Sequence, residues 1–304
     1  MPPGLTEMKR ILVQVSVTDS EFQSCRKWLK ASVDNIVRYS QNPADVLIVY
    51  QTATGAVPKD DFLSHKNTSV YCTPEYSVSK ARNRGICVAV ERGYHYILFH
   101  DAYVFMTRSF IESIDKGIEQ NKEILFGKAK WDENFTDYNH PSHVSLHFKK
   151  VKPNVLRDAF VWLYLFRVDL IEDLRFNEKI GPGKNNPIGA AEDVLFFYTL
   201  FSAKSPILYY CPNALVVHPP RPLDFSKHLS YAKAHGVLYR YLLGRKSCPY
   251  YVYLYFILHV LNTVYRIITL KPNALKIAEE RFAGFIDLDN KRKLFLQSNN
   301  GNPP

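Results

Sequence analysis

The sequence lacks the cysteine pattern of a disulfide-rich or zinc-binding protein. Its five cysteines are odd in number, are scattered between Cys25 and Cys248, and never occur as Cys-x-x-Cys. Disulfide frameworks and structural zinc sites use thiols at short, regular spacings, so neither organises this chain. Free thiols in this arrangement are typical of a reducing compartment.

A secretory signal is also missing from the start of the chain. The stretch MPPGLTEMKR has no apolar core and passes directly into strand-like sequence, which predicts a cytoplasmic protein. The net charge of +10 favours anionic ligands such as phosphates or an acidic membrane surface. Because the basic residues show no RNP, zinc-finger or helix-turn-helix spacing, we expect no nucleic-acid partner.

The 304 residues, 46% of them hydrophobic, are enough for one sizeable core with an appendage. Strands are expected near residues 11–17, 46–50, 70–72, 96–101, 124–127, 160–167, 207–210 and 214–217, with helices near 19–37, 79–90, 110–120 and from 192. This alternation predicts a layered α/β fold. Later residues look helical over 225–243 and 250–270, which divides the chain into residues 1–221 and residues 222–304.

One stretch, Ser79–Phe105, combines a basic turn containing Arg82 with an apolar run that ends at Asp101. The run reads as a buried strand. Ligands of open α/β sheets bind beyond the carboxyl ends of their strands. Asp101 is therefore expected at a ligand site.

Five sequence pieces together resemble one enzyme family. They are ARNRGI (81–86), YILFHD (96–101), LFRVDLIEDLRFNEKIGPG (165–183), AEDV (191–194) and VVHP (216–219), in family order within residues 10–284. The chain resembles the family 2 inverting glycosyltransferases of the GT-A fold that build bacterial surface polysaccharides.

The resemblance implies a central mixed, mainly parallel sheet flanked by helices, with a nucleotide-diphosphate sugar, a UDP-sugar first among the candidates, at its carboxyl edge. Its acceptor would be a glycan or a lipid-linked glycan. The implied catalytic residues are Asp193, as general base, and Glu192. The implied donor-binding residues are Thr18, Asp19, Arg82 and Asp101, and the implied ligands of a divalent cation, Mn²⁺ or Mg²⁺, are Asp101 and His218.

Two positions depart from the family pattern. The second carboxylate of the Asp-x-Asp motif falls on Tyr103, which is no ligand for a hard cation. The second strand ends in Tyr50-Gln51-Thr52 where relatives often place an Asp. These departures leave two alternatives open: arginine and lysine neutralise the leaving diphosphate without metal, or the chain is a non-catalytic binding or scaffold member.

Asp193 carries the chemistry in this interpretation. Transfer with inversion needs one carboxylate beside the acceptor hydroxyl to take its proton. A purely structural explanation exists, because Glu192 and Asp193 favour the first turn of any helix through its dipole. The loop 181–189 before them is expected to close over substrate.

The C-terminal stretch 249–270 is long and apolar, but His259, Thr263 and Arg266 fall on one side of a helix, opposite residues such as Ile257 and Leu261. This amphipathic pattern predicts a surface helix and not a membrane span. Three partners remain open for it: an anionic membrane surface, the core of the protein itself, or a second copy in a homodimer.

Overall fold

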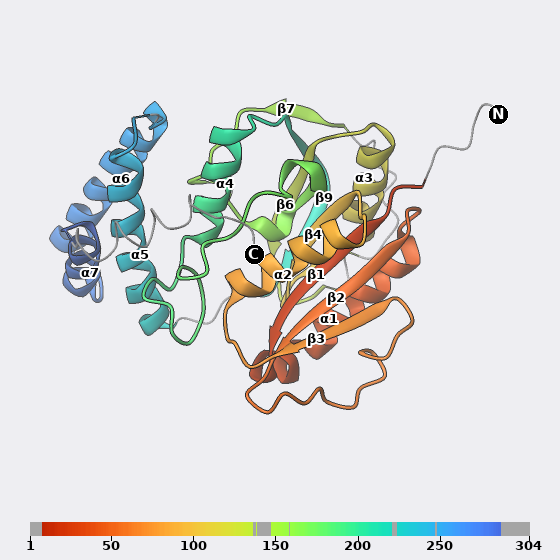
Figure 1. The fold of residues 1–304 in the computed structure, drawn as a ribbon. Coiled ribbons are helices and arrows are strands. Elements are labelled where there is room, and N and C mark those ends of the chain that lie inside the picture. Colours follow the sequence, from red (N-terminus) through yellow and green to blue (C-terminus); the bar gives the residue numbers. More distant parts are fainter. Residues whose placement is uncertain are drawn as a thin grey trace.

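The computed structural model describes residues 8–135, 138, 147–157, 159–220, 224–246 and 248–286. The predicted division at residue 221 lies outside these residues. The described chain is an α/β fold with a nine-stranded mixed sheet and a C-terminal helical part, as the sequence predicted (Figure 1).

The strand order is β3-β2-β1-β4-β8-β6-β9-β5, and β7 pairs with β9. The strands are β1 (Ile11–Thr18), β2 (Ala44–Gln51), β3 (Thr68–Thr73), β4 (Tyr96–Asp101), β5 (Phe105–Met106), β6 (Ile124–Trp131), β7 (Lys149–Val151), β8 (Tyr164–Arg167) and β9 (Leu208–His218). Strands β1 to β4 pair in parallel, as do β6 and β9, whereas β8 runs antiparallel between β4 and β6. One sheet edge therefore collects the carboxyl ends of β1, β2, β4, β6 and β9.

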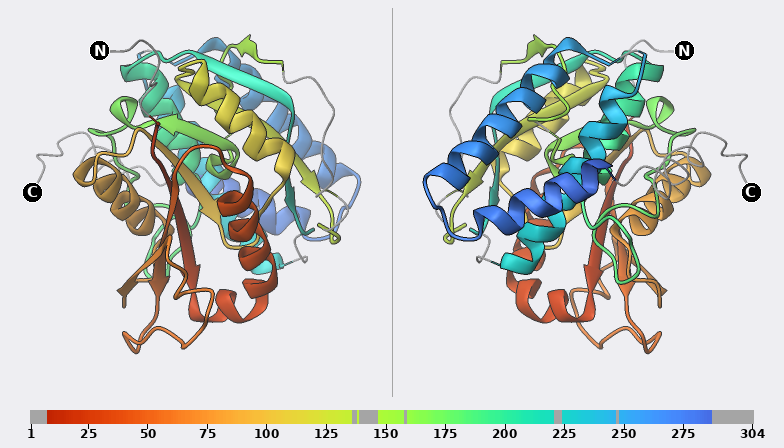
Figure 2. Two further views of the ribbon diagram at one scale, coloured as in Figure 1. Left: turned by 90° about the vertical axis from the view of Figure 1, so that its right-hand side faces the viewer. Right: turned by 90° about the vertical axis from the view of Figure 1, so that its left-hand side faces the viewer.

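Helices cover both faces of the sheet (Figures 1 and 2). Helices α1 (Asp19–Tyr39) and α3 (Arg108–Glu119) pack on one face, and α2 (Val78–Glu91) and α4 (Glu192–Ala203) on the other; two 3₁₀ turns, η2 (Val161–Leu163) and η3 (Val168–Leu170), flank β8. The start of α1 is fixed by a capping box, in which Thr18 and Glu21 satisfy each other's backbone N–H groups.

Two predicted elements differ in the structure. The apolar run 160–167 is a strand only from Tyr164, because Val161–Leu163 forms η2. The two strands predicted over 207–217 are the single strand β9, whose pairing with β6 shifts register between Phe126 and Lys128. An apolar run does not by itself show where a strand leaves its sheet or contains an irregularity.

The C-terminal helices are α5 (Phe225–Leu243), α6 (Tyr250–Ile268) and α7 (Ala274–Ile286). They lie apart from β1 to β3, beyond α4 (Figure 1). Helices α5 and α7 cross at Gly236 and Gly284: a Cβ on Gly236 would lie 2.1 Å from the Arg281 carbonyl oxygen, and a Cβ on Gly284 2.2 Å from that of Lys233. The two backbones therefore touch directly at this crossing.

Candidate functional site

The carboxyl edge of the sheet brings together residues that are far apart in the sequence. Thr18 pairs with Gln51 at the ends of β1 and β2, Asp101 ends β4, and Trp131 pairs with His218 at the ends of β6 and β9. The N-terminal end of α4 reaches the same region through its contact with Arg82. This is the edge at which a ligand was expected.

Helix α2 is fixed in place by the residues around Arg82. The Ser77 hydroxyl caps the helix, and Gly85 packs on the Gln14 side chain, where a Cβ would come within 2.4 Å of Gln14 Cγ. Asn83 accepts a hydrogen bond from the Phe176 N–H at 2.7 Å and donates one to the Phe176 carbonyl at 2.9 Å. The Ala-Arg-Asn-Arg-Gly piece thus binds α2 to β1 and to the loop before α4, with Arg82 directed at α4.

Arg82 makes the central contact of the site. Its guanidinium donates to Asp193 Oδ1 at 2.5 Å and to Glu192 Oε1 at 3.2 Å. The other oxygen of Asp193, Oδ2, accepts from the Val161 N–H at 3.2 Å, and the Phe176 ring lies 5.3 Å from the Arg82 guanidinium carbon. Sequence reasoning had placed Arg82 with the donor and Glu192 and Asp193 with the acceptor, but the structure joins the three side chains in one buried cluster.

The backbone at the start of α4 is unusual. Ala191, the N-cap, has φ of +82°, a left-handed conformation that is rare for residues other than glycine. Gly181 has φ of +99°, and a Cβ there would lie 2.9 Å from the Glu192 side chain. Such strain persists only where the surrounding structure enforces it, and here it accompanies a buried carboxylate pair.

Burial and mutual repulsion determine the protonation of the carboxylates. Burial, together with the charge of Asp193, raises the pKa of Glu192 to about 7, against the lowering effect of Arg82. Burial also raises the pKa of Asp193, an effect that Arg82 opposes and Asp101 reinforces. Burial alone would lower the pKa of Arg82, but the charges of Asp193 and Glu192 outweigh it and raise this pKa. The cluster therefore holds one permanent cation against two carboxyl groups that retain protons more readily than usual.

The glycine-rich loop before α4 is anchored to the start of α2. The Val78 N–H donates to the Pro182 carbonyl at 3.1 Å, and the Lys184 N–H donates to the Tyr76 carbonyl at 3.1 Å. The Ser79 hydroxyl donates to the Ile180 carbonyl at 2.6 Å. The loop expected to close over substrate is held here against α2; its movement remains a prediction.

Thr18 and Asp19 have structural partners. Thr18 caps α1, and its hydroxyl lies 3.0 Å from Glu21 Oε2. Asp19 accepts a hydrogen bond from the Tyr50 hydroxyl; burial first and this bond second raise the pKa of Tyr50. Gln51, at the end of β2, accepts a hydrogen bond from the Ser77 N–H at 2.6 Å and so supports the start of α2. A nucleotide contact by Thr18 or Asp19 remains a proposal.

The strand-end motif offers one carboxylate. Asp101 is partly exposed, whereas His100 points into the core, where its Nε2 lies 2.7 Å from the Ser32 hydroxyl. Burial lowers the pKa of His100 to about 4, so this ring is neutral. The hydroxyl of Tyr103 bonds to Ser24 on α1. The side chain at the second motif position is therefore part of the α1 contact.

His218 is buried at the end of β9, with its Nδ1 2.6 Å from the Pro219 carbonyl oxygen and its ring beside Trp131 and Trp162. An Nδ1–H donated to a carbonyl leaves Nε2 as the basic nitrogen, an arrangement common in metal-binding histidines. Within the described part of the chain, no three His, Cys, Asp or Glu side chains form a group that could hold a metal ion. Asp101 and His218 therefore fit a cation only if donor phosphate oxygens complete its coordination, as they often do for Mg²⁺.

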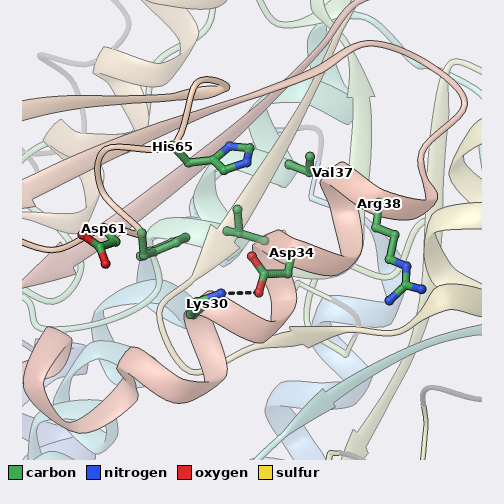
Figure 3. Close-up of a pocket in the computed structure, with 8 residues that line it drawn as sticks. Lys30, Asp34, Val37, Arg38, Asp61 and His65 are labelled. Carbon is green, nitrogen blue, oxygen red and sulfur yellow. Dashed lines mark hydrogen bonds and ion pairs between the residues drawn. The ribbon is translucent and has the colours of Figure 1, made fainter.

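A separate cavity of about 290 Å³ lies between α1 and the loop before β3 (Figure 3). Its lining comes from the second half of α1, including the Lys30–Asp34 ion pair, and from Asp61 and His65 on the loop. Because α1 starts at the carboxyl edge of the sheet and runs back along it, this half of the helix lies toward the opposite edge. None of the candidate site residues lines the cavity.

Two further parts of the site were not identified from the sequence. They are the Val161 N–H and the Phe176 ring, which contact the Arg82–Glu192–Asp193 cluster. Gly181, which also approaches the cluster, opens the loop 181–189 that was expected to close over substrate. A backbone N–H carries no side-chain signature, so the role of Val161 was not visible in the sequence.

No model of a protein family matches the sequence, and no curated protein matches it. Among solved structures, the fold is similar to that of the glycosyltransferase TarS of S. aureus. TarS 1–349 in complex with UDP-GlcNAc matches with a TM-score of 0.51 at 12% identity, over 79% of this chain and 68% of TarS 1–349. A second TarS 1–349 structure gives a TM-score of 0.51 at 12% identity, over 96% of this chain and 81% of the other. The chain therefore has a glycosyltransferase-like α/β fold.

Proposed function

We propose that the protein is an inverting glycosyltransferase, similar to family 2, that moves a sugar from a nucleotide-diphosphate donor to a hydroxyl of a glycan or lipid-linked glycan. The observation that carries this proposal is the buried cluster of Arg82, Glu192 and Asp193 at the carboxyl edge of a glycosyltransferase-like sheet. Because TarS was solved with UDP-GlcNAc, a UDP-sugar is the first donor to test.

Asp193 is the proposed general base. Its two oxygens accept hydrogen bonds from Arg82 and from the Val161 N–H, which fix the plane of the carboxylate. A carboxylate has about four acceptor positions, so two remain for an acceptor hydroxyl. In the reaction, the acceptor oxygen attacks the anomeric carbon, its proton passes to Asp193, and the bond to the nucleotide diphosphate breaks on the opposite face. The raised pKa of Asp193 makes it a stronger base than an exposed aspartate.

Glu192 and Arg82 act on Asp193 in this scheme. Burial raises the pKa of Glu192 to about 7, and a proton held by Glu192 would leave the negative charge of the pair on Asp193. Arg82 holds that charge in place. We assign Arg82 as a positioning residue, and donor diphosphate competes with Asp193 for the same guanidinium.

Asp101, with His218, would hold a divalent cation together with the donor phosphates. When bound, the cation would neutralise charge on the leaving diphosphate. Sugar transfer with Mn²⁺ and with a chelator tests this requirement.

The test of the main proposal is sugar transfer and donor hydrolysis with a panel of UDP-sugars, by wild type and Asp193→Asn. Removing a general base should lower the rate of sugar transfer about 10²–10⁴-fold. Donor binding, measured by thermal shift, should persist, because the amide oxygen of the introduced asparagine can still accept a hydrogen bond from Arg82. Asp169→Asn, at an exposed carboxylate that pairs with Arg167, is the matched control. Equal turnover by wild type and Asp193→Asn would exclude Asp193 as the base.

A non-catalytic member of the fold is the second candidate, and the position of Tyr103 favours it. Tyr103 occupies the position of the second carboxylate of the Asp-x-Asp motif, and its hydroxyl bonds to Ser24. Donor binding by wild type without any turnover, with and without Mn²⁺, would support this candidate.

A further inference from the structure

Helix α6 has its polar side turned inward and its apolar side turned outward. Thr263 bonds to Arg281 of α7, and the His259 ring lies 5.1 Å from that of Tyr239 on α5. The sequence predicted an amphipathic helix, and most of its two sides are present; Asn262, expected on the polar side, is exposed, and Phe256, expected on the apolar side, stacks on Phe285 of α7. In a water-soluble protein, however, the apolar side is the one expected to face the core.

The outward side of α6 forms a large apolar surface, which we call the outer face. Its residues are Tyr253, Leu254, Ile257, Leu258, Val260, Leu261, Val264, Tyr265 and Ile268, each between 43% and 74% exposed. Exposed apolar residues of α7, Leu275, Phe282 and Ile286, belong to the same helical part. Helices α6 and α7 lie toward the viewer in the right-hand view of Figure 2. Apolar surface gathered in this way marks an interaction site.

The charged side chains of α6 and of the segments directly before and after it are all basic, and the acidic residues that follow next in the sequence are Glu279 and Glu280 of α7. Residues 225–278, which include α5 and α6, contain no Asp or Glu. Exposed lysines lie near both ends of α6, Lys246 before it and Lys271 after it, and Lys276 follows in α7. Tyrosines at 250, 253 and 265 on this helix are 49–85% exposed, and such residues suit the boundary between lipid and water.

We propose that the outer face binds the surface of an anionic lipid bilayer, with α6 lying in the plane of the headgroups. Its apolar side chains enter the acyl boundary, and Lys246 and Lys271 contact anionic headgroups. This inference does not depend on the sugar chemistry, because none of these residues belongs to the proposed catalytic site.

A second copy of the chain fits this surface less well. A symmetric dimer through α6 would place this helix, which contains no Asp or Glu, against itself and bring its basic flanks toward each other. A membrane-spanning α6 also fits less well. Helix α6 is long and apolar enough to cross a membrane by length and composition. A membrane-spanning position, however, would carry Arg266 into lipid and remove the Thr263–Arg281 and His259–Tyr239 contacts.

The test is co-sedimentation of the full chain with two kinds of vesicle, one of phosphatidylcholine alone and one of equal parts phosphatidylcholine and phosphatidylglycerol. Wild type should bind the anionic vesicles more tightly. Ile257→Gln/Leu261→Gln removes two outward apolar groups and should weaken binding to both kinds at least about tenfold. Lys246→Glu/Lys271→Glu should weaken binding to the anionic vesicles about tenfold or more and leave the weak binding to neutral vesicles unchanged.

Matched controls carry the same changes elsewhere on the surface. Val90→Gln/Ile207→Gln alters two apolar side chains that are 42% and 41% exposed, and Lys59→Glu/Lys66→Glu reverses two exposed charges. Both should bind as wild type does, and circular dichroism should show that every variant is folded.

Three results would overturn the proposal. The first is that wild type binds neither vesicle. The second is that it forms a dimer that Ile257→Gln/Leu261→Gln dissociates, with no vesicle binding. The third is that the protein resists extraction from cell membranes by alkaline carbonate, as a membrane-spanning helix does.

Discussion

The contact between α2 and α4 and the C-terminal helices both remove basic side chains from solvent, fully for Arg82 and partly in the C-terminal helices. Arg82 lies against two carboxylates, Glu192 and Asp193. Between α5, α6 and α7, three partly buried basic side chains have no ion pair with any described carboxylate: His259, Arg266 and Arg281. One region neutralises its buried charge with counterions, whereas in the other, partial burial and the charge of Arg281 lower the pKa of His259 to about 4.

The two regions differ in how a basic side chain is stabilised away from solvent. A charge in a low-dielectric environment is stable only if it is paired or if it is removed by a shift in pKa. The paired cluster holds two carboxyl groups against a cation at the sheet edge, and the proposed base catalysis requires Asp193 to be ionised there. The basic side chains without ion pairs lie between helices α5, α6 and α7. Most apolar side chains of α6 form the outer face, so polar side chains of this helix lie on its inward side.

The largest effect that would test this comparison is expected from Arg82→Met. The substitution leaves Glu192 and Asp193 buried without their cation, and breaking such a pair costs about 3–5 kcal/mol of unfolding free energy, measured by urea denaturation at neutral pH. Arg84→Met, on the same helix but partly exposed, should cost less than about 1 kcal/mol. Similar losses in the two variants would show that the buried cluster is not held by its cation.

A smaller effect is expected from Glu192→Gln, as a change with pH. With its pKa raised from 4.5 to about 7, Glu192 binds more protons in the folded state than in the unfolded state between these values. Its contribution to stability is therefore present at low pH and lost as pH rises through about 7. The stability of Glu192→Gln relative to wild type should rise on the order of 1–3 kcal/mol between pH of about 5 and about 8. A constant difference would contradict the raised pKa.

The smallest effect, of opposite sign, is expected from His259→Gln. Burial and the charge of Arg281 lower the pKa of His259 from 6.5 to about 4, so the unfolded state binds more protons in this interval. The stability of wild type should therefore fall as pH drops through 6.5, and His259→Gln should reduce that fall. The exposed His228, changed to Gln, is the control. If both variants have the wild-type pH profile, His259 is not buried in its neutral form.

Much of the fold was predictable because it is encoded locally. Apolar runs gave β1, β2 and β4, and the polar residues Thr18, Asp19 and Ser20 gave the start of α1. Asp101 ends β4 as predicted and so lies at the sheet edge that also holds the ends of β1, β2, β6 and β9, since parallel strands end together. These features depend on neighbouring residues alone.

The rest depends on contacts between distant parts of the chain. Arg82 and Asp193 are 111 residues apart, and no local pattern indicates that they form an ion pair. The Val161 N–H binds Asp193 because η2 leaves the sheet, although the sequence there reads as a strand. Amphipathicity gave the two sides of α6 but not which side faces inward, because either orientation has the same periodicity.

The crossing of Gly236 and Gly284 has a mechanical consequence. Two backbones in direct contact cannot slide or rotate past each other unless they first separate, so α5 and α7 act as a rigid frame for α6, and the Phe256–Phe285 stack joins α6 to that frame. If the outer face binds a bilayer as proposed, the lipid surface would therefore hold a rigid group of three helices. The orientation of that group would then limit the distance between the lipid surface and the proposed base, Asp193.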